Sequence, residues 1–250
     1  MLELVIVSMP NATKRREGMV AHLEQCPYPW RFQDAGPASG FIKYDSAQAI
    51  RNIGREINAA ERGCFESHVR AIKAFVENGQ SEFLIVCEDD IRIDFTFPFP
   101  EMLLSMKQAG VEYMRLYSRI MSPARNIQFW RNRRLIRFMW EPYGTQCYVL
   151  SKAGARTLLE YLSVIIRPID NQIDRFWENG LPVYAIFPYP VIELQSSSGI
   201  LRQPETIGRL DRFRLKTRRL IDRIKAVSSA LRINEQDRAF KAALLRAGVS

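Results

Sequence analysis

The feature that most limits the folds open to this chain is an alternation of short apolar runs with helix-like segments from residue 1 to about residue 203. The runs that look like strands are LELVIV, WRFQDA, FLIVC, YMRLYS, QCYVLS and PVYAIFP. The clearest helix-like segments are residues 60–77 and 152–162. Strands that alternate with helices of this length are typical of a mostly parallel sheet covered by helices. The sequence therefore predicts an α/β fold.

The chain of 250 residues is long enough for one large domain or two small halves that share a core. Its first ten residues, MLELVIVSMP, hold a short apolar run with no basic residues before it and no small-residue cleavage pattern. They predict a first strand and not a secretory signal. No apolar run approaches the ~18 residues that a membrane-spanning helix needs, so we expect the protein not to cross a bilayer.

The four cysteines are scattered, with no C-x-x-C pair, and only two histidines accompany them. This spacing argues against a disulfide framework and a zinc site and favours a reducing compartment.

Positive charge is concentrated at the C-terminal end. Residues 204–250 hold twelve Lys or Arg against five Asp or Glu, so +7 of the total net charge of +9 lies there. Apolar residues follow helical spacing within this tail: Leu210, Phe213, Leu220, Ile224, Val227 and Leu231. We divide the chain into a domain at 1–203 and a basic amphipathic helical tail at 204–250. Such a helix can lie on anionic lipid, bind nucleic acid or pack against its own domain.

Three consecutive acids end one of the predicted strands. In FLIVCEDDIRID, five apolar residues lead into Glu88, Asp89 and Asp90. The carboxyl ends of parallel strands form the edge at which open α/β sheets bind ligands. In an extended segment Glu88 and Asp90 point to one side and Asp89 to the other. Carboxylates of this kind suit Mg²⁺ or Mn²⁺, which is usually held by one or two carboxylates plus substrate phosphates. The alternative is an acidic strand end neutralised by water or by arginines.

A histidine precedes these acids in the segment GCFESH, residues 63–68. If this segment is helical, His68 shares one face with Cys64, Ala71, Ile72 and Phe75 and points inward beside the acidic strand. The spacing fits a hydrogen-bonded core histidine as well as a site residue.

Seven segments taken in order resemble glycosyltransferase family 25, the lipopolysaccharide and lipooligosaccharide glycosyltransferases that include bacterial β-galactosyltransferases. They are SMPNATKRRE, FQDA, ERGCFESH, LIVCEDDI, GTQCYVLS, PIDNQIDR and IELQSSSGI. The resemblance covers Met1 to about Ile200, and its most specific part is G-C-x-x-S-H about twenty residues before E-D-D. It departs from the family at Met9, and the tail has no counterpart.

The resemblance implies a GT-A-like, Rossmann-type fold and a sugar-transfer reaction. Glu88 and Asp90 would hold Mn²⁺ or Mg²⁺ against the diphosphate of a nucleotide sugar, in the first instance a UDP-hexose. The cation would neutralise charge on the departing diphosphate. The family is regarded as inverting, so a carboxylate would take the proton of the acceptor hydroxyl as the new bond forms.

Asp170 and Asp174, in RPIDNQIDR, are the candidate bases. They lie four residues apart and share a face if the segment is helical, with Pro168 in the first turn. The alternatives are a helix cap for Asp170 and a salt bridge with Arg167 or Arg175 for Asp174.

Further contacts to the nucleotide sugar are expected from polar side chains near strand ends and in the family motifs. The predicted contacts are Ser8, Arg15, Asp34, Ser67, His68, Glu88, Asp89, Gln195 and Ser198. Gln195 and Ser198 offer uncharged hydrogen bonds suited to sugar hydroxyls.

Residues 125–144 mix arginines with Phe129, Trp130, Phe138 and Trp140. This composition suits a loop that binds an anionic glycan, and it suits equally a β-hairpin with buried aromatic side chains.

The leading hypothesis is an inverting, metal-dependent enzyme that transfers a hexose, in the first instance galactose, from a UDP-sugar to a lipopolysaccharide or lipooligosaccharide glycan. We expect it in the cytoplasm, peripheral on the inner face of a bacterial inner membrane, with residues 204–250 on anionic lipid and no nucleic acid as partner. The alternative is a non-catalytic membrane- or nucleic-acid-binding module that uses the aromatic segment and the tail.

Overall fold

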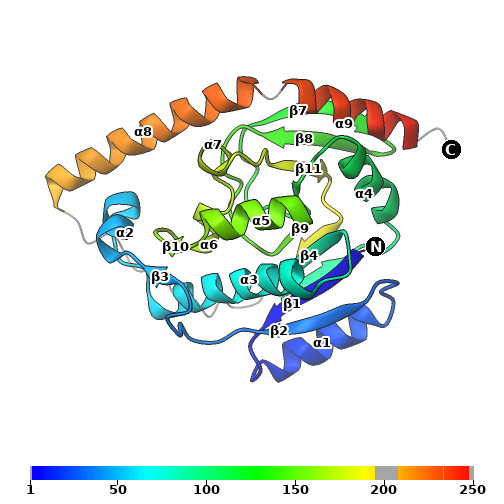
Figure 1. The fold of residues 1–250 in the computed structure, drawn as a ribbon, viewed down its shortest axis with the longest axis horizontal. Coiled ribbons are helices and arrows are strands. Elements are labelled where there is room, and N and C mark those ends of the chain that lie inside the picture. The colour runs from blue at the N-terminus through cyan, green and yellow to red at the C-terminus, as the bar shows by residue number, and fades with distance from the viewer. Residues whose placement is uncertain (1, 195–207, 233, 248–250) are drawn as a thin grey trace.

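The structure, a computed structural model, describes residues 2–194, 208–232 and 234–247 (Figure 1). Its centre is an eight-stranded sheet in the order β2-β1-β4-β9-β6-β11-β8-β7. The strands of this sheet are β1 Leu2–Ser8, β2 Trp30–Asp34, β4 Phe83–Glu88, β6 Tyr113–Arg115, β7 Ala124–Trp130, β8 Arg133–Phe138, β9 Cys147–Ser151 and β11 Tyr184–Phe187. The predicted α/β class is confirmed.

Six of the eight strands run in one direction. β1 pairs in parallel with β2 and β4, and β6 pairs in parallel with β11. β9 runs antiparallel to β4 and β6, and β8 runs antiparallel to β11 and β7. The sheet is therefore mixed and mostly parallel. Because β9 is reversed, the loop that precedes it meets the carboxyl end of β4, where the backbone N–H of Glu88 donates to the carbonyl of Gln146 at 2.9 Å.

Two small sheets lie beside the central one. They pair β10 Val164–Ile165 with β3 Lys43–Tyr44, and β12 Val191–Glu193 with β5 Ile91–Ile93. The helices of the described residues are α1 Thr13–Leu23, α2 Ser46–Ile53, α3 Ala59–Asn78, α4 Phe99–Gln108, α5 Lys152–Tyr161, α6 Ile169–Gln172, α7 Phe176–Asn179, α8 Arg209–Arg232 and α9 Asn234–Ala247.

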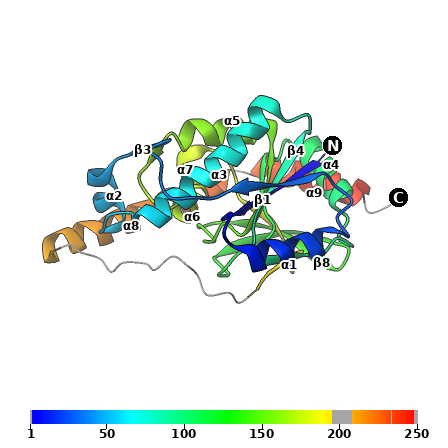
Figure 2. The same ribbon diagram turned by 90° about the horizontal axis from the view of Figure 1, so that it is seen from below.

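Helices cover both faces of the sheet because its central strands carry apolar side chains on both sides. Leu4 and Ile6 of β1 enter a core that α1, α4 and α9 close. Val5 and Val7 enter a second core on the other face, closed by α2, α3, α5 and α8. Figure 2 shows α1 on one side of the sheet and α3 and α5 on the other.

The two C-terminal helices pack on opposite faces of the sheet. Phe240 and Leu244 of α9 are fully buried in the first core. Asp237 of α9 accepts hydrogen bonds from Nε of Arg137 at 2.8 Å and from the hydroxyl of Tyr184 at 2.9 Å. The sequence left three possibilities for the tail, one of which was packing against its own domain. In the structure α9 and one side of α8 pack in this way. The predicted boundary at 203/204 lies outside the described residues.

Among the residues described, we find no helix that combines the length and the apolar character needed to cross a membrane.

Candidate active site

A cavity of about 510 Å³ opens where β1, β2 and β4 end. The parallel register sets Ser8 opposite Asp34 and Val7 opposite Glu88, so the segments that follow these three strands meet at one edge. The cavity is walled by Ser8, by Gly36 and Pro37 after β2, by the three acids after β4, and by the first half of α3. Its volume is that of a site for a small-molecule ligand.

The helix that contains GCFESH forms one wall, and its glycine has a steric reason. α3 begins with a capping box in which Asn58 and Glu61 satisfy each other's backbone N–H groups. A Cβ on Gly63 would lie 2.1 Å from the carbonyl oxygen of Gly36, so only glycine lets α3 approach the loop after β2. One turn further along α3, the carboxylate of Glu66 accepts hydrogen bonds from backbone N–H groups of this loop. The bond from the N–H of Ser39 is 2.9 Å long. α3 therefore holds a cavity loop in place.

The protein itself neutralises the middle acid of the cluster. Asp89 is buried, accepts a hydrogen bond from the Ser8 hydroxyl at 2.6 Å and pairs with Arg15 at 3.1 Å. The predicted residues Ser8, Arg15 and Asp89 are thus brought together, and they tie β1 and α1 to the end of β4. Glu88 and Asp90 line the same cavity.

Glu88 combines partial burial at the cavity wall with a neighbouring negative charge. Its Oε1 accepts from the hydroxyl of Thr145 at 2.7 Å and lies 3.9 Å from Nε2 of His68. Burial, which disfavours the charged form, and the repulsion from Asp90 raise the pKa of Glu88 to about 7.

This shift predicts a pH dependence of stability that Glu88→Gln removes. The folded pKa of about 7 lies above the ordinary value of 4.5. The folded state therefore holds the proton on Glu88 more tightly than the unfolded state does. The contribution of the protonated Glu88 to the stability of the fold is fully present below pH 4.5 and is lost as the pH rises through 7. We expect the free energy of unfolding to fall more steeply between pH 5 and 8 in the wild type than in Glu88→Gln, measured by urea unfolding with a chelator present. Equal slopes for the two proteins would contradict the assignment.

His68 lies between the core and the cavity. Its ring is fully buried, Nδ1 lies 3.1 Å from the hydroxyl of Tyr148, and Nε2 has no hydrogen-bond partner among the described residues. Burial, followed by the positive charge of Arg115, lowers the pKa of His68 to about 3. The imidazole is therefore neutral at physiological pH.

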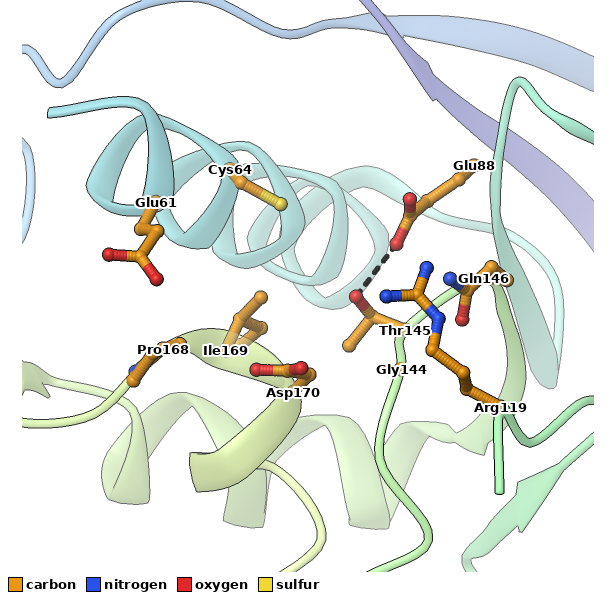
Figure 3. Close-up of a pocket in the computed structure, with 10 residues that line it drawn as sticks. All are labelled: Glu61, Cys64, Glu88, Arg119, Gly144, Thr145, Gln146, Pro168, Ile169 and Asp170. Atoms are coloured by element: carbon orange, nitrogen blue, oxygen red, sulfur yellow. Dashed lines mark hydrogen bonds between the residues drawn. The ribbon is translucent and has the colours of Figure 1, made fainter. Parts of the chain in front are cut away.

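A second, smaller pocket of about 100 Å³ adjoins the cavity and shares Cys64, Glu88 and Arg119 with it. Figure 3 shows Asp170 of α6 across this pocket from Glu88 and Arg119. Thr145 and Gln146, from the loop before β9, complete the wall. The two pockets thus meet at a polar junction of carboxylate, guanidinium and thiol groups.

The second predicted base lies outside both pockets. Asp174 is fully buried, accepts from the hydroxyl of Tyr113 at 2.6 Å and pairs with Arg115 at 3.3 Å. α6 ends at Gln172, so one helix does not carry both aspartates. Arg175, named above as a possible partner of Asp174, pairs instead with acids on α7 and α8 and in the loop before β9.

Other predicted contacts are scattered. Ser67 is buried and donates to the carbonyl of Gly63 within its own helix at 2.7 Å. Asp34 pairs with Arg16, and its side chain is 67% exposed. Asp34 is not among the residues that line the cavity. Gln195 and Ser198 lie outside the described residues.

The structure adds site residues that the sequence analysis did not assign. Arg119 donates to Glu193 at 2.7 Å, and the amide of Gln146 donates to the same carboxylate at 3.1 Å. Thr145 and Gln146 belong to the quoted segment GTQCYVLS, which was the available signal. Glu193 belongs to the quoted segment IELQSSSGI, where only Gln195 and Ser198 were assigned contacts, and Arg119 stands in none of the quoted segments. Only the fold brings these two side chains to the junction.

The aromatic segment is largely structural. β7 and β8 form a hairpin at the sheet edge, with Trp130 and Phe138 buried in the two cores. Trp140 stacks on Trp177 at 5.0 Å, and only Phe129 of the four aromatics is mostly exposed. The hairpin interpretation is therefore favoured over the acceptor loop.

The cavity wall offers a divalent cation only part of its coordination shell, so phosphate or water would have to supply the remaining ligands. No group of three or more His, Cys, Asp or Glu able to enclose a metal is present in the described part of the chain. Glu88 and Asp90 nevertheless supply carboxylate oxygens at one cavity. Such a pair fits Mn²⁺ or Mg²⁺, whose remaining positions are usually filled by phosphate and water.

Comparisons with known proteins identify the family of this chain. The family model of glycosyltransferase family 25 (LPS biosynthesis protein) matches residues 1–173. The lacto-N-neotetraose biosynthesis glycosyltransferase LgtE of Neisseria meningitidis serogroup B (strain ATCC BAA-335 / MC58) is 22% identical over an alignment of 200 residues, and the match covers 73% of this chain and 71% of that protein.

Two solved structures show a distant likeness. One is a glycosyltransferase involved in the glycosylation of the major capsid of PBCV-1, with a TM-score of 0.38 and 11% identity over 76% of this chain and 71% of that one. The other is A197 from STIV, with a TM-score of 0.44 and 10% identity over 81% of this chain and 98% of that one.

Proposed function

This chain belongs to glycosyltransferase family 25, and on that premise we propose that it is an inverting, metal-dependent hexosyltransferase. The donor is a UDP-sugar, in the first instance UDP-galactose, and the acceptor is a lipopolysaccharide or lipooligosaccharide glycan. The observation that carries the proposal is the junction of the two pockets. A cavity large enough for a nucleotide meets a small pocket at Glu88 and Arg119, with Asp170 on the far wall.

The donor occupies the large cavity in this proposal. Its nucleotide lies between the loop after β2 and the first half of α3, and its diphosphate faces Glu88 and Asp90. A divalent cation held by these two carboxylates would supply positive charge against the leaving diphosphate. Arg119, which lines both pockets, adds a fixed positive charge at the junction.

Asp170 is the base in this proposal. The acceptor oxygen attacks the anomeric carbon, the bond from that carbon to the phosphate oxygen breaks, and the Asp170 carboxylate takes the hydroxyl proton. Asp170 lines the small pocket, whereas Asp174 is bound to Tyr113 and Arg115 in the core. The geometry therefore supports Asp170 over Asp174.

We further propose that the enzyme works in the bacterial cytoplasm at the inner face of the inner membrane. A lipopolysaccharide or lipooligosaccharide acceptor is anchored in lipid, so an enzyme that extends it has to reach the membrane surface.

The proposal predicts Mn²⁺-dependent binding of UDP that requires Asp90. At a UDP concentration about a hundredfold above Kd, binding stabilises the fold by about 2.7 kcal/mol. For a chain of this size that corresponds to a rise in Tm of about 5–10 °C. We expect this rise in the wild type with Mn²⁺ and UDP together, and its loss in Asp90→Ala, as measured by thermal unfolding.

The matched control is Glu17→Ala, which removes an exposed carboxylate on α1 outside the donor cavity. It should keep the full rise in Tm. Mn²⁺-dependent hydrolysis of UDP-galactose, UDP-glucose and UDP-N-acetylglucosamine then identifies the sugar. If UDP gives no Mn²⁺-dependent shift and the protein instead binds oligonucleotides in a salt-sensitive way that Asp90→Ala leaves unchanged, the non-catalytic binding module is the better description.

A further inference from the structure

Helix α8 runs along the edge of the molecule with a defined side facing the domain (Figure 1). It packs beside α2 and α7. Leu215, Ala226 and Ala230 are buried on this side, and Asp222 pairs with Arg175 of the domain at 2.7 Å. These contacts set the rotation of the helix about its own axis.

The opposite side of α8 presents a row of large apolar side chains to solvent. The exposed fractions are 71% for Phe213, 57% for Leu220, 61% for Ile224, 44% for Val227 and 60% for Leu231. At 3.6 residues per turn these five positions lie within about 40° of one line along the helix, and the buried side chains lie about 90–150° around the helix from that line. A surface helix ordinarily directs such a stripe toward its own core. A contiguous apolar row that faces outward marks an interaction surface.

Basic side chains border this apolar stripe on both flanks. All are exposed: Arg212, Lys216 and Arg223 on one flank, and Arg214, Lys225 and Arg232 on the other. Long basic side chains can lay their methylene groups along an apolar surface and extend their charges to its rim. This arrangement matches a lipid bilayer, with acyl chains beneath the stripe and anionic headgroups beside the arginines and lysines.

We propose that the outward face of α8, residues 212–232, is an interfacial membrane-binding surface that takes anionic phospholipid. The helix lies in the plane of the membrane with its stripe in the headgroup and acyl boundary and its opposite side on the protein. A second copy of the chain is a poorer occupant, because it would bring the same positive flanks against each other.

The inference deepens the proposed function, on which it rests for the identity of the acceptor. α8 contacts α7, which follows α6, the helix that carries Asp170. Arg223 of α8 lies over the ring of Trp140, which stacks on Trp177 of α7. Binding through α8 would therefore hold α7, and with it the adjoining α6 that carries Asp170, near the lipid that holds the acceptor.

The test is flotation of the full chain with vesicles of phosphatidylethanolamine and phosphatidylglycerol, against vesicles of phosphatidylcholine alone. Wild type should float with the anionic vesicles. The triple variant L220Q/I224Q/L231Q should lose at least about tenfold in partition coefficient, because three exposed apolar side chains no longer enter the bilayer. The flank variant K216E/K225E should lose about tenfold or more on anionic vesicles and nothing on neutral ones.

The matched control is Leu104→Gln, which changes an exposed leucine on α4 and should bind as wild type does. Since all substituted side chains are exposed, Tm should stay unchanged in every variant. The inference is wrong if wild type floats with neither vesicle, or if the triple variant binds as well as wild type. It is also wrong if wild type is a dimer that the triple variant converts to a monomer.

A soluble assay separates this inference from the proposed function. Hydrolysis of the UDP-sugar without vesicles should be equal in wild type and in the triple variant. If wild type floats but shows no Mn²⁺-dependent reaction with any UDP-sugar, the membrane surface stands and the proposed reaction falls.

Discussion

Asp170→Asn should lower kcat by about 10²- to 10⁴-fold, the range that a positioned general base contributes. Asparagine keeps the size of the side chain at the wall of the small pocket but cannot accept the acceptor proton. Because the large cavity does not include Asp170, the affinity for UDP with Mn²⁺ should stay within about twofold of wild type. The measurement combines steady-state kinetics on an acceptor glycan with thermal unfolding in the presence of UDP.

The control for this variant is Asn171→Ala, one residue further along α6 and not a lining residue of either pocket. It should keep nearly full activity. If Asp170→Asn retains more than about a third of the wild-type kcat, Asp170 is not the base.

Asp174→Ala should act on stability and not primarily on chemistry. Asp174 and Arg115 are both fully buried and lie 3.3 Å apart. Removing the aspartate leaves the Arg115 guanidinium without its counter-charge in the core, which costs about 3–5 kcal/mol. For a chain of this length we expect a fall in Tm of about 6–20 °C in thermal unfolding.

An exposed ion pair provides the comparison. Lys73 and Glu77 lie 3.4 Å apart on α3, and both side chains are about half exposed. Glu77→Ala should cost about 1 kcal/mol or less, because solvent screens the charges. If Asp174→Ala unfolds no earlier than Glu77→Ala, the buried pair does not have the structural role assigned to it.

The buried pair also explains why Asp174 belongs to the same motif as Asp170 without lining the site. Arg115 donates to the carbonyl of Gly144 as well as pairing with Asp174. Gly144 directly precedes Thr145, which lines the small pocket and donates to Glu88. Asp174 is thus a positioning residue that supports the pocket loop through Arg115, and some loss of activity in its variants should accompany the loss of stability.

The strand ends were predictable because parallel strands bring their carboxyl ends to one edge whatever the side-chain details. Ser8, Arg15 and the acids after β4 were placed together on this ground, and the structure brings them together. Asp34 shared the same logic, yet its side chain turns to Arg16 at the surface. A single strand-end position can face either way, and its sequence neighbours do not determine which.

In the tail, too, the sequence predicted the element but not the direction in which its side chains point. Helical spacing predicted an amphipathic helix, and one reasonable expectation was that its apolar stripe would pack on the domain. In the structure the small residues Ala226 and Ala230 face the protein, while Ile224 and Leu231 face outward. Periodicity shows which residues share a face, but it does not show which face meets the protein.

The amino-acid sequence alone was enough to predict an α/β sheet, an acidic cluster at a strand end and a basic amphipathic tail, and to recognise a family resemblance. These are properties of local periodicity and of short motifs. The tertiary structure decided that Asp170 and not Asp174 lines a pocket, that Arg119 and Glu193 join the site, and that the stripe of α8 points away from the domain. The physical reason is that these outcomes depend on contacts between residues far apart in the chain, such as Arg115 with Asp174 and Arg175 with Asp222.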